Sequence, residues 1–164
     1  MNESLSIIEA EIIELESLDA IRTAAFQPVF ESFKAILGEN IYERAQEQED
    51  LAQADMLRNM FRAESEWSVF VLKVSDANIG FVSIRTNPDT LVGEIGLNAI
   101  SPQHASKGWG TKLYEFALQE MKSKGMKVAT VATGGDPGHA PARRAYEKAG
   151  FDVQIPSVWY CKEL

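Results

Sequence analysis

Hydrophobic residues recur with helical spacing over the first third of the chain. One such stripe covers 18–37 and ends at Gly38, a residue that commonly terminates helices. Pro28 lies within the stripe and predicts either a kink or the start of a second helix. A further helix is predicted over 50–63, and the acidic, polar segment 39–49 is predicted to connect the two.

Strand patterns lie on both sides of these helices. Residues 4–15 favour a first strand with an exposed polar face, although their Glu, Leu and Ala content also permits a helix. After the helices, 67–74 and 79–86 flank a turn at 75–78 and predict a hairpin. The apolar run 91–100 is typical of a buried strand.

The rest of the chain alternates helix and strand. Its predicted elements are a helix from Trp109 to the C-cap Gly125, a strand over 126–133, a loop over 134–138, a helix over 142–149 and a final strand over 151–164. The whole order predicts an α/β (α+β) fold. Its sheet is expected to be mixed, mostly antiparallel and twisted, with helices on both faces.

Composition narrows the class of protein. A length of 164 residues predicts one domain, 1–164, and 45% hydrophobic with 24% charged residues is typical of a soluble globular protein. No apolar run reaches the length of a membrane span, and the N-terminus has no signal-peptide pattern. A single cysteine excludes an internal disulfide framework and favours the cytoplasm. The net charge of −8 argues against nucleic-acid binding and favours cationic partners.

Charge singles out one turn. The chain has 24 acidic and 16 basic residues, yet 95–114 contains no acid and carries Lys107 and Lys112. This segment is a strand, a short polar loop with Gly108 and Gly110, and the start of a helix. A helix N-terminus offers unpaired N–H groups and a partial positive charge, and glycine lets a ligand come close to the backbone. The segment therefore predicts a phosphate site, the alternative being a turn that needs glycine only for its shape.

Two common phosphate motifs do not match this turn. A Walker loop requires G-x-x-x-x-G-K-[ST], whereas Gly110 is followed by Thr111 and Lys112 with no glycine at the required earlier position. A dinucleotide fingerprint requires a third glycine where this chain has Leu113. Nucleoside triphosphates and dinucleotides are therefore disfavoured as ligands.

The turn instead resembles the phosphate loop of the GNAT superfamily, the acetyl-CoA-dependent N-acyltransferases. The resemblance lies in 98–102 and 107–111, with Ala105 standing where the family usually has Gln or Arg. It implies a GNAT-like fold and acetyl-CoA as cosubstrate, without a metal. Pyrophosphate contacts are implied for Ser106, Lys107, Gly108, Trp109, Gly110 and Thr111, and pantetheine contacts for the backbone of Asn98, Ala99 and Ile100.

A second motif strengthens the resemblance. Residues 142–151, ARRAYEKAGF, are similar to the family's late signature N-x-x-A-x-x-x-Y-x-K-x-G-F. In the family the tyrosine, here Tyr146, protonates the departing CoA thiolate. His139 stands at the position of the family's Asn and is implied to contact the pantetheine arm. The alternatives are a core tyrosine with a satisfied hydroxyl and a histidine that caps a helix or packs in its loop.

A catalytic base is expected because the attacking nitrogen must lose a proton. Glu94 is the first choice, since some GNAT members carry a base glutamate at this point of the strand. Strict alternation would place Glu94, Gly96 and Asn98 on one face. Asp136 and His139 are the rivals, and deprotonation in solution is a further alternative.

The resemblance implies an N-acetyltransferase that moves acetyl from acetyl-CoA to a primary amine by direct attack. The acceptor is a small amine or a protein amino group. The acids of 39–50 could attract a cationic amine, although such a run is more often a solvated face. Two isolated histidines and no Cys/His cluster give no metal-site pattern, and neither nucleic acid nor membrane is an expected partner. The alternatives are a non-catalytic acyl-CoA-binding protein and a partner-binding GNAT-like protein, dimeric through the final strand.

Overall fold

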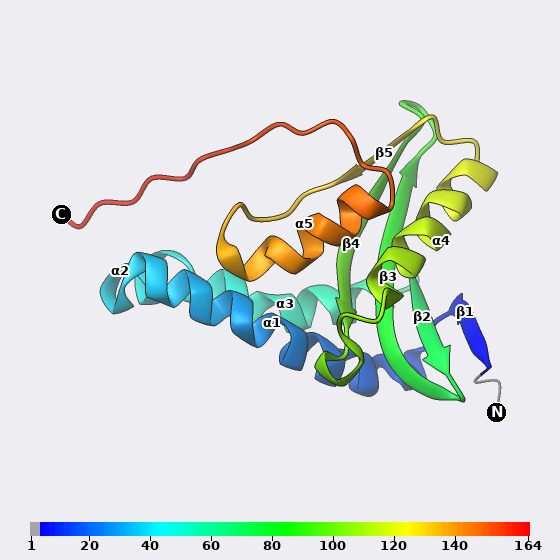
Figure 1. Ribbon diagram of the computed structural model, residues 1–164, viewed down its shortest axis with the longest axis horizontal. Helices are drawn as coiled ribbons and strands as arrows, with labels where there is room; N and C mark the ends of the chain where they lie inside the picture. The colour runs from blue at the N-terminus through cyan, green and yellow to red at the C-terminus, as the bar shows by residue number, and fades with distance from the viewer. Residues whose placement is uncertain (1–3) are drawn as a thin grey trace.

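The computed structural model describes residues 4–164 and contains a five-stranded sheet in the order β1-β2-β3-β4-β5 (Figure 1). Its strands are β1 (Leu5–Glu9), β2 (Ser68–Val74), β3 (Ala77–Asn87), β4 (Val92–Ile100) and β5 (Val128–Val131). Every neighbouring pair is antiparallel except β4 and β5, which are parallel. The prediction of a mixed, mostly antiparallel sheet is confirmed.

Helices cover both faces of this sheet (Figure 1). The helices are α1 (Leu15–Leu37), α2 (Glu39–Ala45), α3 (Glu47–Met60), α4 (Trp109–Ser123) and α5 (Ala140–Lys148). Successive residues of β2 point to two hydrophobic cores, one on each face of the sheet. Val69 and Val71 pack with Leu18 of α1, whereas Phe70 packs with Leu113 of α4. We call these the α1/α3 face and the α4/α5 face. None of the helices within residues 4–164 combines the length and apolar character needed to cross a membrane.

The sheet opens between β4 and β5. Their pairing starts at Val92 with Val128 and ends at Ile95 with Val131, while β4 continues to Ile100. The last five residues of β4 therefore have no β5 partner on that side. Backbone N–H and C=O groups in such a stretch need another partner, which makes this opening a natural place for an extended ligand.

A β-bulge in β4 corrects one prediction from strand alternation. Ile84 pairs with Ile95 and Val82 with Asn98, so one residue of β3 faces two residues of β4. The extra residue shifts the alternation, and Asn98 shares the α4/α5 face with Ile95. Glu94 pairs with Arg85 and lies on the opposite face. The expectation that Glu94 and Asn98 share a face is therefore wrong.

Three predictions in the first part of the chain also differ from the structure. The connecting segment 39–49 forms α2 and the start of α3, and α1 continues through Pro28 without a break. The first strand ends at Glu9 and is followed by a 3-10 turn, Ile12–Glu14.

The predicted final strand over 151–164 is absent, because this segment has no regular structure. Figure 1 shows it running away from the sheet towards α2, where Asn40 Nδ2 donates to Glu163 Oε1 at 2.7 Å. Ile155 is 93% exposed. Pro156 lacks the N–H that a strand position would use, and β5, the strand at this sheet edge, has only four residues.

Candidate functional site

The predicted phosphate turn forms a tight loop that ends in the first turn of α4. Ser106 and Gly108 both have positive φ, 62° and 82°, and these two left-handed residues bring the chain into α4 at Trp109. The first turn of α4 carries no acidic residue. Its free N–H groups and partial positive charge therefore remain available to an anion. Gly110 lies close to α5, since a Cβ placed on it would be 3.7 Å from Ala145 Cβ.

A cavity of about 980 Å³ joins this loop to the opening in the sheet. Its lining comes from α1 and α3 on one side, β4 in the middle, and the predicted phosphate loop (106–111) and α5 on the other side. It includes these predicted site residues: Glu94, Asn98, Ala99, Ile100, Ser106, Gly108, Trp109, Gly110, Thr111, His139 and Tyr146. The side chain of Lys107 is exposed and lies outside this lining.

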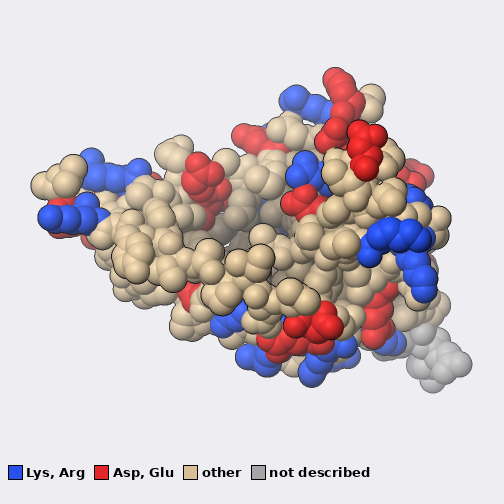
Figure 2. Space-filling model, turned by 90° about the horizontal axis from the view of Figure 1, so that it is seen from above, with Lys and Arg blue, Asp and Glu red and all other residues tan. Residues whose placement is uncertain are grey.

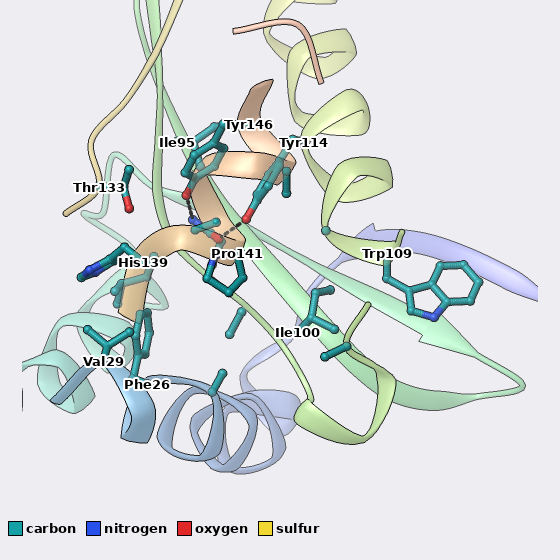
Figure 3. Close-up of a pocket in the computed structure, with 18 of the residues that line it drawn as sticks. Phe26, Val29, Ile95, Ile100, Trp109, Tyr114, Thr133, His139, Pro141 and Tyr146 are labelled. Carbon is teal, nitrogen blue, oxygen red and sulfur yellow. Dashed lines mark hydrogen bonds between the residues drawn. The ribbon is translucent and has the colours of Figure 1, made fainter. Parts of the chain in front are cut away.

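Tyr146 is buried on the α4/α5 face with only 6% of its surface exposed. Its hydroxyl oxygen accepts a hydrogen bond from Asn98 Nδ2 at 3.1 Å, and Tyr114 donates to Asn98 Oδ1 at 2.7 Å. These are the dashed lines of Figure 3. The two tyrosine rings are 4.5 Å apart. Burial raises the pKa of Tyr146, and its polar contacts with Asn98 and Tyr114 lower it only in part.

Glu94 lies across β4 from this tyrosine, at the α1/α3 end of the cavity. Arg85 holds its carboxylate with Nε at 2.7 Å and Nη2 at 2.6 Å, both to Oε2. The same guanidinium lies 4.8 Å from the centre of the Trp67 ring. The Trp67 ring covers Gly96, where any Cβ would collide with it. Glycine at position 96 is therefore required by the tryptophan that forms this wall.

The loop before α5 contains a second polar group. Asp136 contacts His139 Nδ1 through Oδ1 and accepts from Ser32 Oγ and the Gly138 N–H through Oδ2, both at 2.9 Å. Burial would raise the pKa of Asp136, but these hydrogen bonds and the nearby His139 outweigh it and lower the pKa. Arg143 Nη1 donates to the Asp136 carbonyl at 2.8 Å and holds the loop. His139 lines the cavity, whereas Asp136 does not.

The α1/α3 end of the cavity is mostly apolar. Its walls include Phe26, Val29, Met56, Met60 and Trp67, and Figure 3 shows Phe26 and Val29 beside His139. Figure 2 shows a hollow in the upper surface that mostly uncharged residues border. The acids of 39–50 do not line the cavity within the described part of the chain.

Sequence reasoning missed three side chains that shape this site. Tyr114 carries a hydroxyl on the buried face of α4, four residues after Gly110, and this polar group on an apolar stripe was a usable signal. Arg85 and Trp67 had no such signal. Their contacts depend on the register of β3 against β4 and on how the preceding loop enters β2.

The chain belongs to the acetyltransferase (GNAT) family, whose model matches residues 27–151. A curated relative, an uncharacterized N-acetyltransferase named YsnE from Bacillus subtilis (strain 168), is 31% identical over 72 residues. That alignment covers 44% of this chain and 48% of the relative, so the chain spans about half the length of the curated relative it matches.

Solved structures of the family share the fold. The aminoglycoside N-acetyltransferase AAC(6')-Iy in complex with CoA has a TM-score of 0.65 at 13% identity, covering 100% of this chain and 98% of that one. A GNAT acetyltransferase from Brucella melitensis in complex with acetyl-CoA has a TM-score of 0.65 at 14% identity, with 92% and 84% covered. At such identities the likeness concerns the fold alone.

Proposed function

We propose that this protein is an N-acetyltransferase that transfers acetyl from acetyl-CoA to a primary amine by direct attack. The observation that carries the proposal is the single cavity that joins the phosphate loop, the unpaired end of β4 and the Tyr146 hydroxyl. Family membership supports the class of reaction. The acetyl specificity, the acceptor and the residue roles are our inference.

The chain offers acetyl-CoA two kinds of backbone partner. The N–H groups of 106–111 would hold its pyrophosphate, where the first turn of α4 has no acid to repel it. The unpaired stretch of β4 at Asn98, Ala99 and Ile100 would bind the pantetheine arm as an added strand does. The residues of the loop and strand thus fit this cosubstrate, which supplies the activated acyl group.

The two faces of β4 separate the proposed acid from the proposed base. A C–N bond forms and the C–S bond breaks, so one proton must leave the amine and another must reach the sulfur. Glu94 would accept the first from the α1/α3 side, and Tyr146 would supply the second from the α4/α5 side. Positioning both groups around one acyl carbon requires no covalent enzyme intermediate.

Replacing Glu94 by Gln tests the base. We expect kcat near neutral pH to fall by about 10²–10⁴, the usual contribution of general base catalysis. Because this change also removes the ion pair with Arg85, the matched control is Arg85→Gln, which breaks the pair but keeps the carboxylate. Steady-state rates of CoA release should show Arg85→Gln far less impaired than Glu94→Gln.

His139→Gln belongs in the same series. If it removes most of kcat while Glu94→Gln leaves kcat unchanged, the base is His139, oriented by Asp136. If neither change has an effect, the amine loses its proton in solution.

The lining of the cavity also supports a class of acceptor. Its residues with full charges are Glu94, Arg144 and Lys148, and Arg85 already pairs with the glutamate. A polycation would therefore meet little uncompensated negative charge, whereas the apolar walls suit a hydrocarbon or aromatic group. We propose a small primary amine with one positive charge and an apolar body.

A comparison of acceptors checks this class. We expect kcat/KM for 2-phenylethylamine to exceed that for spermidine and for sisomicin by about tenfold or more, because burying an aromatic group contributes on the order of 2 kcal/mol. CoA release with each amine at equal concentration measures it. A tenfold preference for sisomicin would contradict the apolar acceptor and favour an aminoglycoside.

A further inference from the structure

The proposed proton donor Tyr146 and two other side chains form one directed chain of hydrogen bonds. Asn98 lies in the middle, with Tyr114 from α4 on one side and Tyr146 from α5 on the other (Figure 3). Tyr114 and Tyr146 are buried, at 5% and 6% exposure, and both line the cavity. The direction of each bond can be assigned from the chemistry of its atoms.

The backbone carbonyl of Gly96 fixes the Asn98 amide. A carbonyl oxygen can only accept, so the amide atom 2.9 Å from it is the NH₂ group. The Asn98 oxygen then faces Tyr114, and because this oxygen also only accepts, Tyr114 donates its hydrogen at 2.7 Å. The second N–H of Asn98 donates to the Tyr146 oxygen at 3.1 Å.

In this assignment Asn98 does not take the hydrogen of the Tyr146 hydroxyl, so this hydrogen is free to turn into the cavity that both residues line. A phenol has one hydrogen, and the bond with Asn98 occupies an oxygen lone pair instead. We propose that Asn98, anchored by Gly96 and Tyr114, is a positioning residue that turns the Tyr146 O–H towards the departing sulfur. This role rests on the proposed acetyl transfer.

The same chain of hydrogen bonds stabilises the negative charge that forms on the Tyr146 oxygen during proton transfer. When the Tyr146 O–H bond breaks and the S–H bond forms, the phenolate accepts the Asn98 N–H, and charge-assisted hydrogen bonds are stronger than neutral ones. Tyr114 polarises the amide from its other end. The phenolate regains its proton from solvent after the product leaves.

Asn98→Asp replaces the N–H donor in the middle of this chain of hydrogen bonds by an oxygen that only accepts. A carboxylate has no hydrogen to give, so both tyrosines would donate to it and the Tyr146 hydrogen would turn inward. We expect kcat to fall by about 10² or more. The dissociation constant for CoA should change by less than about threefold, since the proposed cosubstrate contacts at this position are made by the backbone.

A double-mutant cycle with Tyr146→Phe separates positioning from other effects. The new carboxylate would also repel a thiolate, and a packing defect would slow any variant, but both effects persist without the Tyr146 hydroxyl. If Asn98 acts through Tyr146, Asn98→Asp changes kcat less than about threefold in the Tyr146→Phe protein. The same loss in both backgrounds, or no loss in the wild type, would overturn the proposal.

Rates are measured as CoA release from acetyl-CoA with 2-phenylethylamine, or with sisomicin if that acceptor is faster. If thermal unfolding shows that Asn98→Asp does not fold, Tyr114→Phe takes its place in the cycle. We expect Tyr114→Phe to cause a smaller loss of kcat, and only when Tyr146 is present. If the wild-type protein binds CoA but transfers acetyl to neither amine, both the proposed function and this role are contradicted. If the wild type is active and Asn98→Asp has the same kcat, this role alone is contradicted.

Discussion

Replacing Tyr146 by Phe is expected to lower kcat by about 10²–10⁴ while leaving CoA binding nearly unchanged. The change removes one oxygen from a ring that packs against Tyr114 at 4.5 Å and Phe151 at 5.9 Å, so the core of the α4/α5 face keeps its shape. Steady-state kinetics give kcat, and calorimetry gives the dissociation constant for CoA.

The pH dependence of the wild type adds a second observation. Because burial raises the pKa of Tyr146, this hydroxyl keeps its proton throughout the neutral and mildly alkaline range. A fall in kcat between pH 7 and 9 is therefore not expected from the proton donor. An alkaline limb within that range that vanishes in Tyr146→Phe would contradict the raised pKa.

Tyr160→Phe is the matched control, since that tyrosine lies in the C-terminal segment with 87% of its surface exposed. It should leave kcat unchanged. A confirmed transferase in which Tyr146→Phe is equally fast has another proton donor. A protein that binds CoA and transfers no acetyl group is instead the non-catalytic acyl-CoA-binding alternative.

The parts of the site that the sequence predicts well are local. The strand, turn and helix around Gly108 and the helix that carries Tyr146 are each set by residues close together in the chain. Their start and stop signals are capping glycines, a proline at the beginning of α5 and a regular apolar spacing. These signals act within a few residues, so reading them requires no knowledge of the sheet.

What the sequence does not predict depends on contacts between distant segments. The bulge at Gly96 and Leu97 is stabilised by Ser83 of β3, whose Oγ donates to the Leu97 carbonyl at 2.9 Å. That single extra residue moves Asn98 to the other face from Glu94. The ion pair of Arg85 with Glu94 depends on the same register.

The absent final strand shows the same limit. The segment 151–164 has alternating apolar residues that suit a strand, but a strand also needs a partner with free edge groups. β5 pairs with β4 over four residues only, and Pro156 removes a donor from the segment. The strand propensity of this segment therefore has no long sheet edge to pair with in the described part of the chain.

Gly110→Glu is expected to abolish the stabilisation that CoA gives to the folded protein. At a CoA concentration one hundred times the dissociation constant, the free energy of unfolding of the wild type should rise by about 2.7 kcal/mol. For a chain of this length that corresponds to a rise in Tm of about 5–10 °C. A carboxylate at position 110 would put negative charge in the first turn of α4, against the phosphates that its N–H groups would hold.

The structure supplies the control for this experiment. A Cβ at position 110 would meet its nearest neighbours at ordinary contact distances, 3.7 Å from Ala145 and 3.9 Å from Tyr114. Gly110→Ala should therefore fold and keep most of the shift in Tm, while Gly110→Glu loses it. If millimolar CoA stabilises neither the wild type nor Gly110→Ala, the turn needs glycine only for its shape. In that case the protein does not bind the cosubstrate that acetyl transfer requires, and a partner-binding role explains the fold better.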